Sequence, residues 1–135
     1  MAGKIKAVFF DLDNTLYDTS NQVDLARQSA VDAMFDSGLK ASKKSVRKKL
    51  DERVLIRGPN YTRHFNELIR LYGQIDYKIL AVGVVAYHDA KNEYLTPFSD
   101  TLPALCALRD MGLKLGVITD GVAVKQWEKL IRLKL

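Results

Sequence analysis

The sequence has little cysteine and no long hydrophobic run, and each shortage excludes a class of protein. Cys106 is the single cysteine, so no disulfide can form within the chain, and a reducing compartment is expected. Its helical surroundings predict a buried small hydrophobic residue rather than a nucleophile. The longest apolar stretch, Ile79 to Tyr87, is much shorter than the ~20 residues of a membrane span, and the apolar run before Asp11 is too short for a signal peptide. These shortages predict a soluble, cytoplasmic protein without a membrane partner.

The composition is that of an ordinary globular protein. Hydrophobic residues make up 47% of the 135 residues and charged residues 27%, with a formal net charge of +5. This length and content are enough for one domain, or for a small core domain that carries an insert.

One segment combines a hydrophobic run with two carboxylates. The run Ala7 to Phe10 leads directly into Asp11 and Asp13. This pattern predicts a buried parallel strand that delivers both carboxylates to the ligand-binding end of a sheet. On an extended chain the two side chains point to the same side and repel each other, and a hard cation such as Mg²⁺ relieves this repulsion and attracts phosphate. The alternative is an acidic turn without chemistry.

The longer segment Val8 to Tyr17 resembles the first motif of the haloacid dehalogenase superfamily, in its phosphatase branch. The resemblance implies that Asp11 is the nucleophile that forms an aspartyl-phosphate and that Asp13 is the general acid and base. It also implies Mg²⁺ as cofactor, with Asp11 and Asp13 as metal ligands and Leu12 at the phosphate. The dehalogenase branch usually lacks an acid at the second position, so Asp13 favours phosphoryl transfer over cleavage of a carbon–halogen bond.

Four amphipathic segments follow without a strand pattern between them. The spacing of apolar residues predicts helices over residues 18–38, 42–56, 65–72 and 76–95. In the last one, the predicted inner face carries Ile79, Val82, Val85 and Ala86. Residues 18–96 are therefore expected to be a helical bundle. The resemblance implies an α-helical cap domain here, inserted in a core domain formed by residues 1–17 and 97–135.

The chain then returns to the alternation of an α/β fold. We expect a helix from Thr101 to Met111, a second buried strand from Lys114 to Thr119, and a helix from Val122 onward. In this last helix the predicted inward residues are Val124, Trp127, Leu130 and Ile131. The predicted fold class is thus α/β, a Rossmann-like core with an inserted helical cap.

The turn Thr119-Asp120-Gly121 lies where a strand passes into a helix. The Thr119 hydroxyl and the amides near a helix start can donate hydrogen bonds to an anion. The segment resembles the second motif of the superfamily, which implies that Thr119 holds a phosphoryl oxygen with the Asp120 amide beside it.

Basic residues are concentrated in the second predicted helix. The concentration comprises Lys40, Lys43, Lys44, Arg47, Lys48, Lys49, Arg53 and Arg57. They could contact nucleic acid or attract anionic substrates. We favour a solvated face of the cap over a nucleic-acid partner, because no aromatic residues are interleaved with the charges.

Two further motifs of the superfamily, a lysine and an acidic pair that completes the metal site, cannot be located after Gly121. Two strands alone would expose a hydrophobic edge. We therefore expect either part of a longer enzyme or a chain that completes itself as a homodimer or strand-swapped assembly. The leading hypothesis is a Mg²⁺-dependent phosphatase for a small phosphorylated metabolite. A 2-haloacid dehalogenase and a non-catalytic, oligomerising fragment stay open as alternatives.

Overall fold

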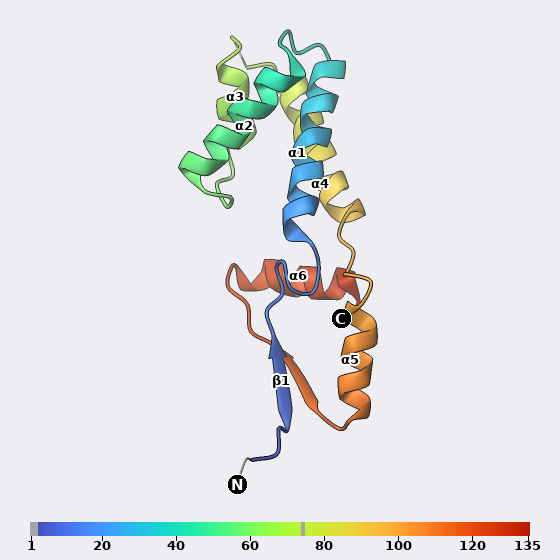
Figure 1. The fold of residues 1–135 in the computed structure, drawn as a ribbon. Helices are drawn as coiled ribbons and strands as arrows, with labels where there is room; N and C mark the ends of the chain where they lie inside the picture. Colours follow the sequence, from blue (N-terminus) through green and yellow to red (C-terminus); the bar gives the residue numbers. More distant parts are fainter. Residues whose placement is uncertain (1–2, 74) are drawn as a thin grey trace. The chain divides into compact units, whose positions relative to one another are not determined.

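The computed structural model describes residues 3–73 and 75–135, which contain two strands and six helices (Figure 1). The chain divides into two compact units. One consists of Met1–Gln22 with Leu95–Leu135, and the other of Val23–Tyr94. We call them the sheet unit and the helical unit.

The sheet unit is built on two parallel strands. β1 (Ala7–Phe10) pairs with β2 (Lys114–Val117), in a register that joins Ala7 to Lys114 and Phe10 to Val117. Parallel neighbours need a long crossover connection, and α5 (Thr101–Asp110) forms its last part. α6 (Ala123–Leu133) follows β2 and lies across the carboxyl end of the strands (Figure 1). The pairing confirms the predicted α/β fold class.

The core of the sheet unit lies at the carboxyl end of β1. Leu12, Leu16, Tyr17 and Leu133 form one buried cluster. Phe9, by contrast, is 63% exposed and rests on Gly116, where an added Cβ would lie 2.6 Å from the Phe9 ring. The predictions of two buried strands were therefore wrong, because no residue of β1 or β2 is fully buried and the Phe9 side of β1 is open. The reason is that no helix of the described residues covers this side of the sheet.

The predicted inner face of α6 was also wrong. Val124, Trp127 and Ile131 are exposed, and only Leu130 of the four residues packs against the core cluster. The helix instead turns its polar side, with the buried Gln126, inward. The physical reason is that carboxylate and carbonyl oxygens facing this side of the helix need hydrogen-bond donors, as described below.

An apolar cavity of about 630 Å³ opens beside β2 and α6 in the sheet unit. Its lining includes Leu115, Val117, Trp127 and Leu130. With Phe9 and Ile118 also exposed, the hydrophobic edge expected from the sequence is present. Cys106 on α5 is exposed as well, which corrects the prediction that it is buried.

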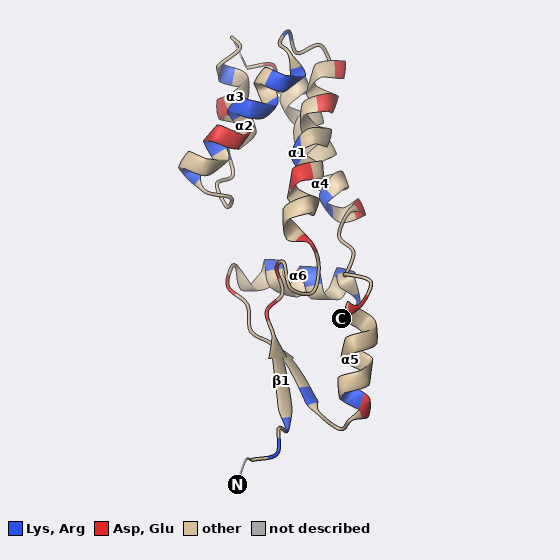
Figure 2. Ribbon diagram, viewed as in Figure 1, with Lys and Arg blue, Asp and Glu red and all other residues tan. Residues whose placement is uncertain are grey.

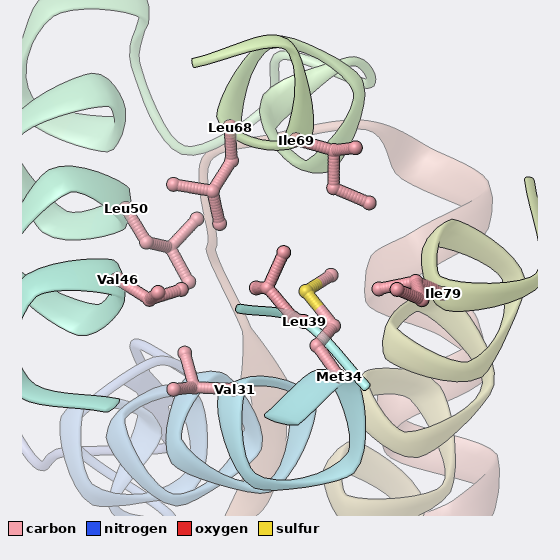
Figure 3. Close-up of a cluster of buried hydrophobic side chains, with 8 residues drawn as sticks. All are labelled: Val31, Met34, Leu39, Val46, Leu50, Leu68, Ile69 and Ile79. Atoms are coloured by element: carbon pink, nitrogen blue, oxygen red, sulfur yellow. The ribbon is translucent and has the colours of Figure 1, made fainter. Parts of the chain in front are cut away.

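The helical unit confirms the four predicted helices. They are α1 (Thr19–Asp36), which begins in the sheet unit, α2 (Lys43–Arg57), α3 (His64–Arg70) and α4 (Tyr77–Glu93). Side chains from all four converge on one core, together with Leu39 (Figure 3). The core consists of Val31, Met34, Leu39, Val46, Leu50, Leu68, Ile69 and Ile79. Apolar spacing of three and four residues places these side chains on the inner helix faces.

One face of α4 differs from the prediction. Ile79 is buried as expected, whereas Val85 is 58% exposed. Gly83 takes the buried place instead, because the Met34 side chain occupies the space that a Cβ at Gly83 would fill. The large Met34 side chain and the missing side chain of Gly83 complement each other.

Basic residues recur along α2 (Figure 2), and ion pairs neutralise many of them. Arg47 contacts Asp24 and Asp51, and Arg53 and Arg57 both contact Glu67. Lys43 pairs with Asp32 and Lys48 with Glu52. Five of the eight basic residues therefore have a carboxylate partner within the helical unit, which fits the solvated face favoured from the sequence. No helix in the described part of the chain is long and apolar enough to cross a membrane.

Candidate phosphoryl-transfer site

A tight turn follows β1 and presents the two acidic residues of the first motif. β1 ends at Phe10, and the completely buried Leu12 separates the exposed Asp11 from the half-buried Asp13. The Leu12 carbonyl accepts hydrogen bonds from the amides of Thr15 and Leu16, which closes the turn. Leu12 thus holds the turn against the core, while Asp11 and Asp13 on either side of it are more exposed.

The Asp13 carboxylate is surrounded by four donors. Its Oδ1 accepts hydrogen bonds from the Tyr17 hydroxyl at 2.6 Å, the Thr19 hydroxyl at 3.0 Å and Lys129 Nζ at 2.7 Å. Its Oδ2 accepts one from Gln126 Nε2 at 2.9 Å. A partly buried charge needs such partners, and here two of them come from α6.

These donors change the acidity of Asp13. Burial raises its pKa, but the hydrogen bonds from Lys129, Tyr17 and Gln126 and the charge of Lys129 outweigh burial and lower the pKa to about 2. The pKa of Tyr17 is raised, first by burial and then by its hydrogen bond to Asp13. In this arrangement Asp13 is a carboxylate and Tyr17 a neutral donor at neutral pH.

The second motif lies at the same end of the sheet. The Ile118 amide donates to the Phe10 carbonyl at 2.9 Å, so the residues that follow the two strands emerge side by side. Thr119 Oγ1 accepts a hydrogen bond from Gln126 Nε2 at 2.7 Å, and the Asp120 carbonyl accepts one from the same nitrogen at 3.0 Å. Gln126 therefore connects the Thr119 segment to Asp13.

Sequence reasoning missed Gln126 and Lys129. Gln126 and Lys129 are three residues apart and so share one side of α6, opposite its exposed apolar residues. That spacing was the available signal, but it does not reveal which side of an amphipathic helix faces the protein.

The remaining predicted residues have simpler surroundings. The Leu12 amide donates to Asp11 Oδ1 at 2.8 Å, so in this structure the predicted phosphate donor is taken by the predicted nucleophile. No group of three or more His, Cys, Asp or Glu side chains suited to a metal ion occurs in residues 3–73 and 75–135. Because the Asp13 oxygens already have four donors, Asp11 is the acidic side chain of the motif that stays available to a cation. These residues do not form a complete Mg²⁺ site by themselves.

The family of the chain follows from its similarity to known proteins. The model of the haloacid dehalogenase-like hydrolase family matches residues 5–135. The chain belongs to the haloacid dehalogenase-like hydrolases. This confirms the family resemblance seen in the segment Val8 to Tyr17.

Relatives within the haloacid dehalogenase-like hydrolases are close. The chain is 45% identical over 130 residues to the glyceraldehyde 3-phosphate phosphatase of Methanocaldococcus jannaschii and 49% identical over 132 residues to that of Methanopyrus kandleri. Each match covers 96% of this chain and 57% of the relative. The chain thus spans somewhat more than half the length of these relatives.

Two solved structures share the fold. The HAD-hydrolase YfnB from Bacillus subtilis, bound to magnesium, has a TM-score of 0.57 at 18% identity. The 2-haloacid dehalogenase from Pseudomonas syringae has a TM-score of 0.59 at 23% identity. Each comparison covers 98% of this chain and 60% of the other. They establish the fold of a haloacid dehalogenase-like hydrolase.

The contact between Lys129 and Asp13 makes the stability of the fold depend on pH. Because the folded pKa is depressed, the carboxylate stabilises the fold above its unfolded pKa of about 3.9, and this stabilisation is lost as the pH falls toward 2. In Lys129→Met we expect the Asp13 pKa to rise and the unfolding free energy at pH 7 to fall by about 1 kcal/mol, since the site is partly screened by solvent. A ¹³C NMR titration of the Asp13 carboxyl and urea unfolding measure these changes. The control is Lys125→Met, at an exposed position of α6; an equal effect of both variants contradicts the prediction.

Proposed function

We propose that the polypeptide carrying these residues is a phosphatase for a small phosphorylated metabolite, with a triose phosphate as the substrate class. Both relatives named above are glyceraldehyde 3-phosphate phosphatases. In this proposal the sheet unit is the incomplete core domain, and the helical unit is the cap that selects the substrate.

The observation that carries the proposal is the meeting of two motifs at one end of a parallel sheet. β1 delivers Asp11 and Asp13, and β2 delivers Thr119 to the same edge, in the register that the strand pairing sets. Hydrogen bonds of Gln126 then connect Asp13 with Thr119. Ligands of open α/β sheets bind outside the carboxyl ends of the strands, so these groups surround the expected ligand position.

Each residue has a role that its surroundings support. Asp11 is exposed and bonded to its neighbouring amide, which leaves a carboxylate oxygen to attack a phosphorus atom as nucleophile. Thr119 donates its hydroxyl proton to a phosphoryl oxygen, beside the Asp120 amide, and the Leu12 amide becomes available to the phosphate when Asp11 leaves it.

Asp13 serves as the general acid and base. As a carboxylate it is in the state that takes a proton from water in the hydrolysis of the aspartyl-phosphate, and it becomes a stronger base when the Lys129 contact that lowers its pKa is released. Protonation of the leaving group requires Asp13 in the opposite protonation state, as a neutral carboxylic acid. Asp13 must then lose the Lys129 contact, because that contact is a main cause of its low pKa.

The proposal includes a Mg²⁺ requirement. The ion would neutralise phosphate charge beside Asp11, a carboxylate of the kind that Mg²⁺ prefers. Since the described residues do not complete a metal site, we derive no step through the ion.

The test is hydrolysis of glyceraldehyde 3-phosphate and of an aryl phosphate by the purified protein, with Mg²⁺ and after its removal with a chelator. We expect turnover of the triose phosphate that disappears on chelation and returns when Mg²⁺ is added in excess. Metal-independent turnover overturns the metal requirement. Absence of turnover by a folded protein favours the non-catalytic, oligomerising fragment, whose homodimer or strand-swapped form sedimentation would reveal.

A further inference from the structure

Gln126 is a buried polar side chain at the meeting point of the two motifs. It is 7% exposed, and its Nε2 lies within hydrogen-bond distance of three oxygens. These are Asp13 Oδ2 at 2.9 Å, Thr119 Oγ1 at 2.7 Å and the Asp120 carbonyl at 3.0 Å. The three acceptors belong to two segments that are more than 100 residues apart in the chain. A buried amide with these contacts fixes the distance between the segments.

The chemistry of the amide gives each contact a direction. The nitrogen of a Gln side chain carries two hydrogens and accepts none, so all three oxygens must act as acceptors, and one hydrogen is shared between two of them. The Asp13 carboxylate and the Asp120 carbonyl can only accept hydrogen bonds. If the Gln126 amide were flipped, its oxygen would face these oxygens, and their partial negative charges would repel each other. This orientation of Gln126 is therefore the one that the network requires.

The Thr119 hydroxyl is oriented as a consequence. Its oxygen accepts from Gln126 Nε2, which leaves its own proton for another acceptor. Within the described chain, the acceptor of that proton is the Asp120 carbonyl at 3.4 Å, which is near the limit of a hydrogen bond. An anion in front of Thr119 would offer a much better acceptor.

The backbone next to Gln126 confines its side chain. Gly121 has a φ of +123°, a conformation that other residues rarely adopt, and a Cβ there would lie 3.5 Å from Gln126 Cδ. The turn between β2 and α6 therefore passes closely along the Gln126 side chain. This contact restricts the rotamers of Gln126 and helps to keep its amide between the two motifs.

We propose that Gln126 is a positioning residue, which holds the Asp13 carboxylate and the Thr119 hydroxyl in register so that Thr119 donates its proton to a phosphoryl oxygen. The inference rests on the proposed phosphatase function and deepens it, because it assigns a role to a helix residue outside both motifs. Gln126 acts through Thr119 and Asp13 and does not itself bind the phosphate.

A reciprocal pair of isosteric substitutions tests this role. Gln126→Glu replaces the donating amide by a carboxylate beside Asp13, while Glu128→Gln makes the opposite change at an exposed position of the same helix, where Glu128 pairs with Arg132. We expect Gln126→Glu to weaken binding of inorganic phosphate by about tenfold or more, as for loss of a hydrogen bond to a charged group, and Glu128→Gln to change it less than about twofold. Binding is followed by the NMR shifts of the Thr119 and Asp120 amides in this protein.

A double-mutant cycle separates positioning from a merely structural role. If Gln126 acts through Thr119, Gln126→Leu should cost little phosphate affinity once Thr119→Val has removed the hydroxyl. Additive losses, or phosphate binding that is unchanged in Gln126→Glu, overturn the positioning role alone. If the unmodified protein binds no phosphate, the proposed function fails and the positioning role fails with it. Far-ultraviolet circular dichroism of each variant tests whether the fold is retained.

Discussion

Asp11→Asn is expected to lower kcat for hydrolysis of a phosphate monoester by about 10⁴-fold or more, as for the loss of a catalytic nucleophile. The amide has the shape of the carboxylate but lacks its nucleophilic oxygen, so no aspartyl-phosphate can form. Asn at this position can still accept the hydrogen bond that the Leu12 amide donates to Asp11 Oδ1. The variant should therefore fold normally, and turnover and acid-stable labelling by phosphate measure its effect.

The matched control for Asp11→Asn is Asp110→Asn. Asp110 lies at the end of α5, with a side chain that is 76% exposed and 3.9 Å from Arg109. The same chemical change at this site should leave kcat within about twofold of the unmodified protein. Comparable turnover in Asp11→Asn and the unmodified protein would refute the assignment of Asp11 as nucleophile.

The largest expected loss of stability comes from the core of the helical unit. Leu50 on α2 is 1% exposed and packs among residues of the other helices (Figure 3). Leu50→Ala removes buried apolar area and leaves a cavity, and we expect it to lower the unfolding free energy of this unit by about 3 kcal/mol. Urea unfolding followed by far-ultraviolet circular dichroism gives the free energy.

Leu55→Ala makes the same substitution on the same helix at a position that is 87% exposed. Because little apolar area is lost there, we expect a change within about 0.5 kcal/mol. The comparison separates the cost of the cavity from the small gain in helix propensity that both variants share. Equal effects of the two substitutions would mean that the α2 core does not limit the stability of the helical unit.

Secondary structure, which depends on residues close together in the chain, was predicted well. All six helices and both strands lie within a few residues of the bounds that apolar spacing indicated. For example, the helix expected over residues 76–95 is α4, and Asp76 at its start accepts hydrogen bonds from the amides of Lys78 and Ile79. Such signals operate within a few residues, so they can be read without knowledge of the fold.

Burial of whole faces was predicted less reliably. The pattern of α6 identifies an amphipathic helix, but Trp127 and Ile131 are exposed and Gln126 is buried. The same limit applies to Phe9 on β1 and Val85 on α4, both of which are exposed. An apolar pattern marks residues that can be buried, and whether they are depends on which neighbours the fold supplies.

The sequence by itself determined the family, the order of the elements and the residues of the two motifs, because each of these depends on local spacing and residue type. Only the tertiary structure brought Asp13 and Thr119 together through Gln126 and placed Lys129 on Asp13. The two contacts with Asp13 join residues more than 100 positions apart, and they depend on the register of two parallel strands and on the side that α6 turns inward. Neither property is encoded in the residues that make the contacts. They follow from the requirement that a partly buried carboxylate be surrounded by donors, which the folded chain meets with the polar side of its last helix.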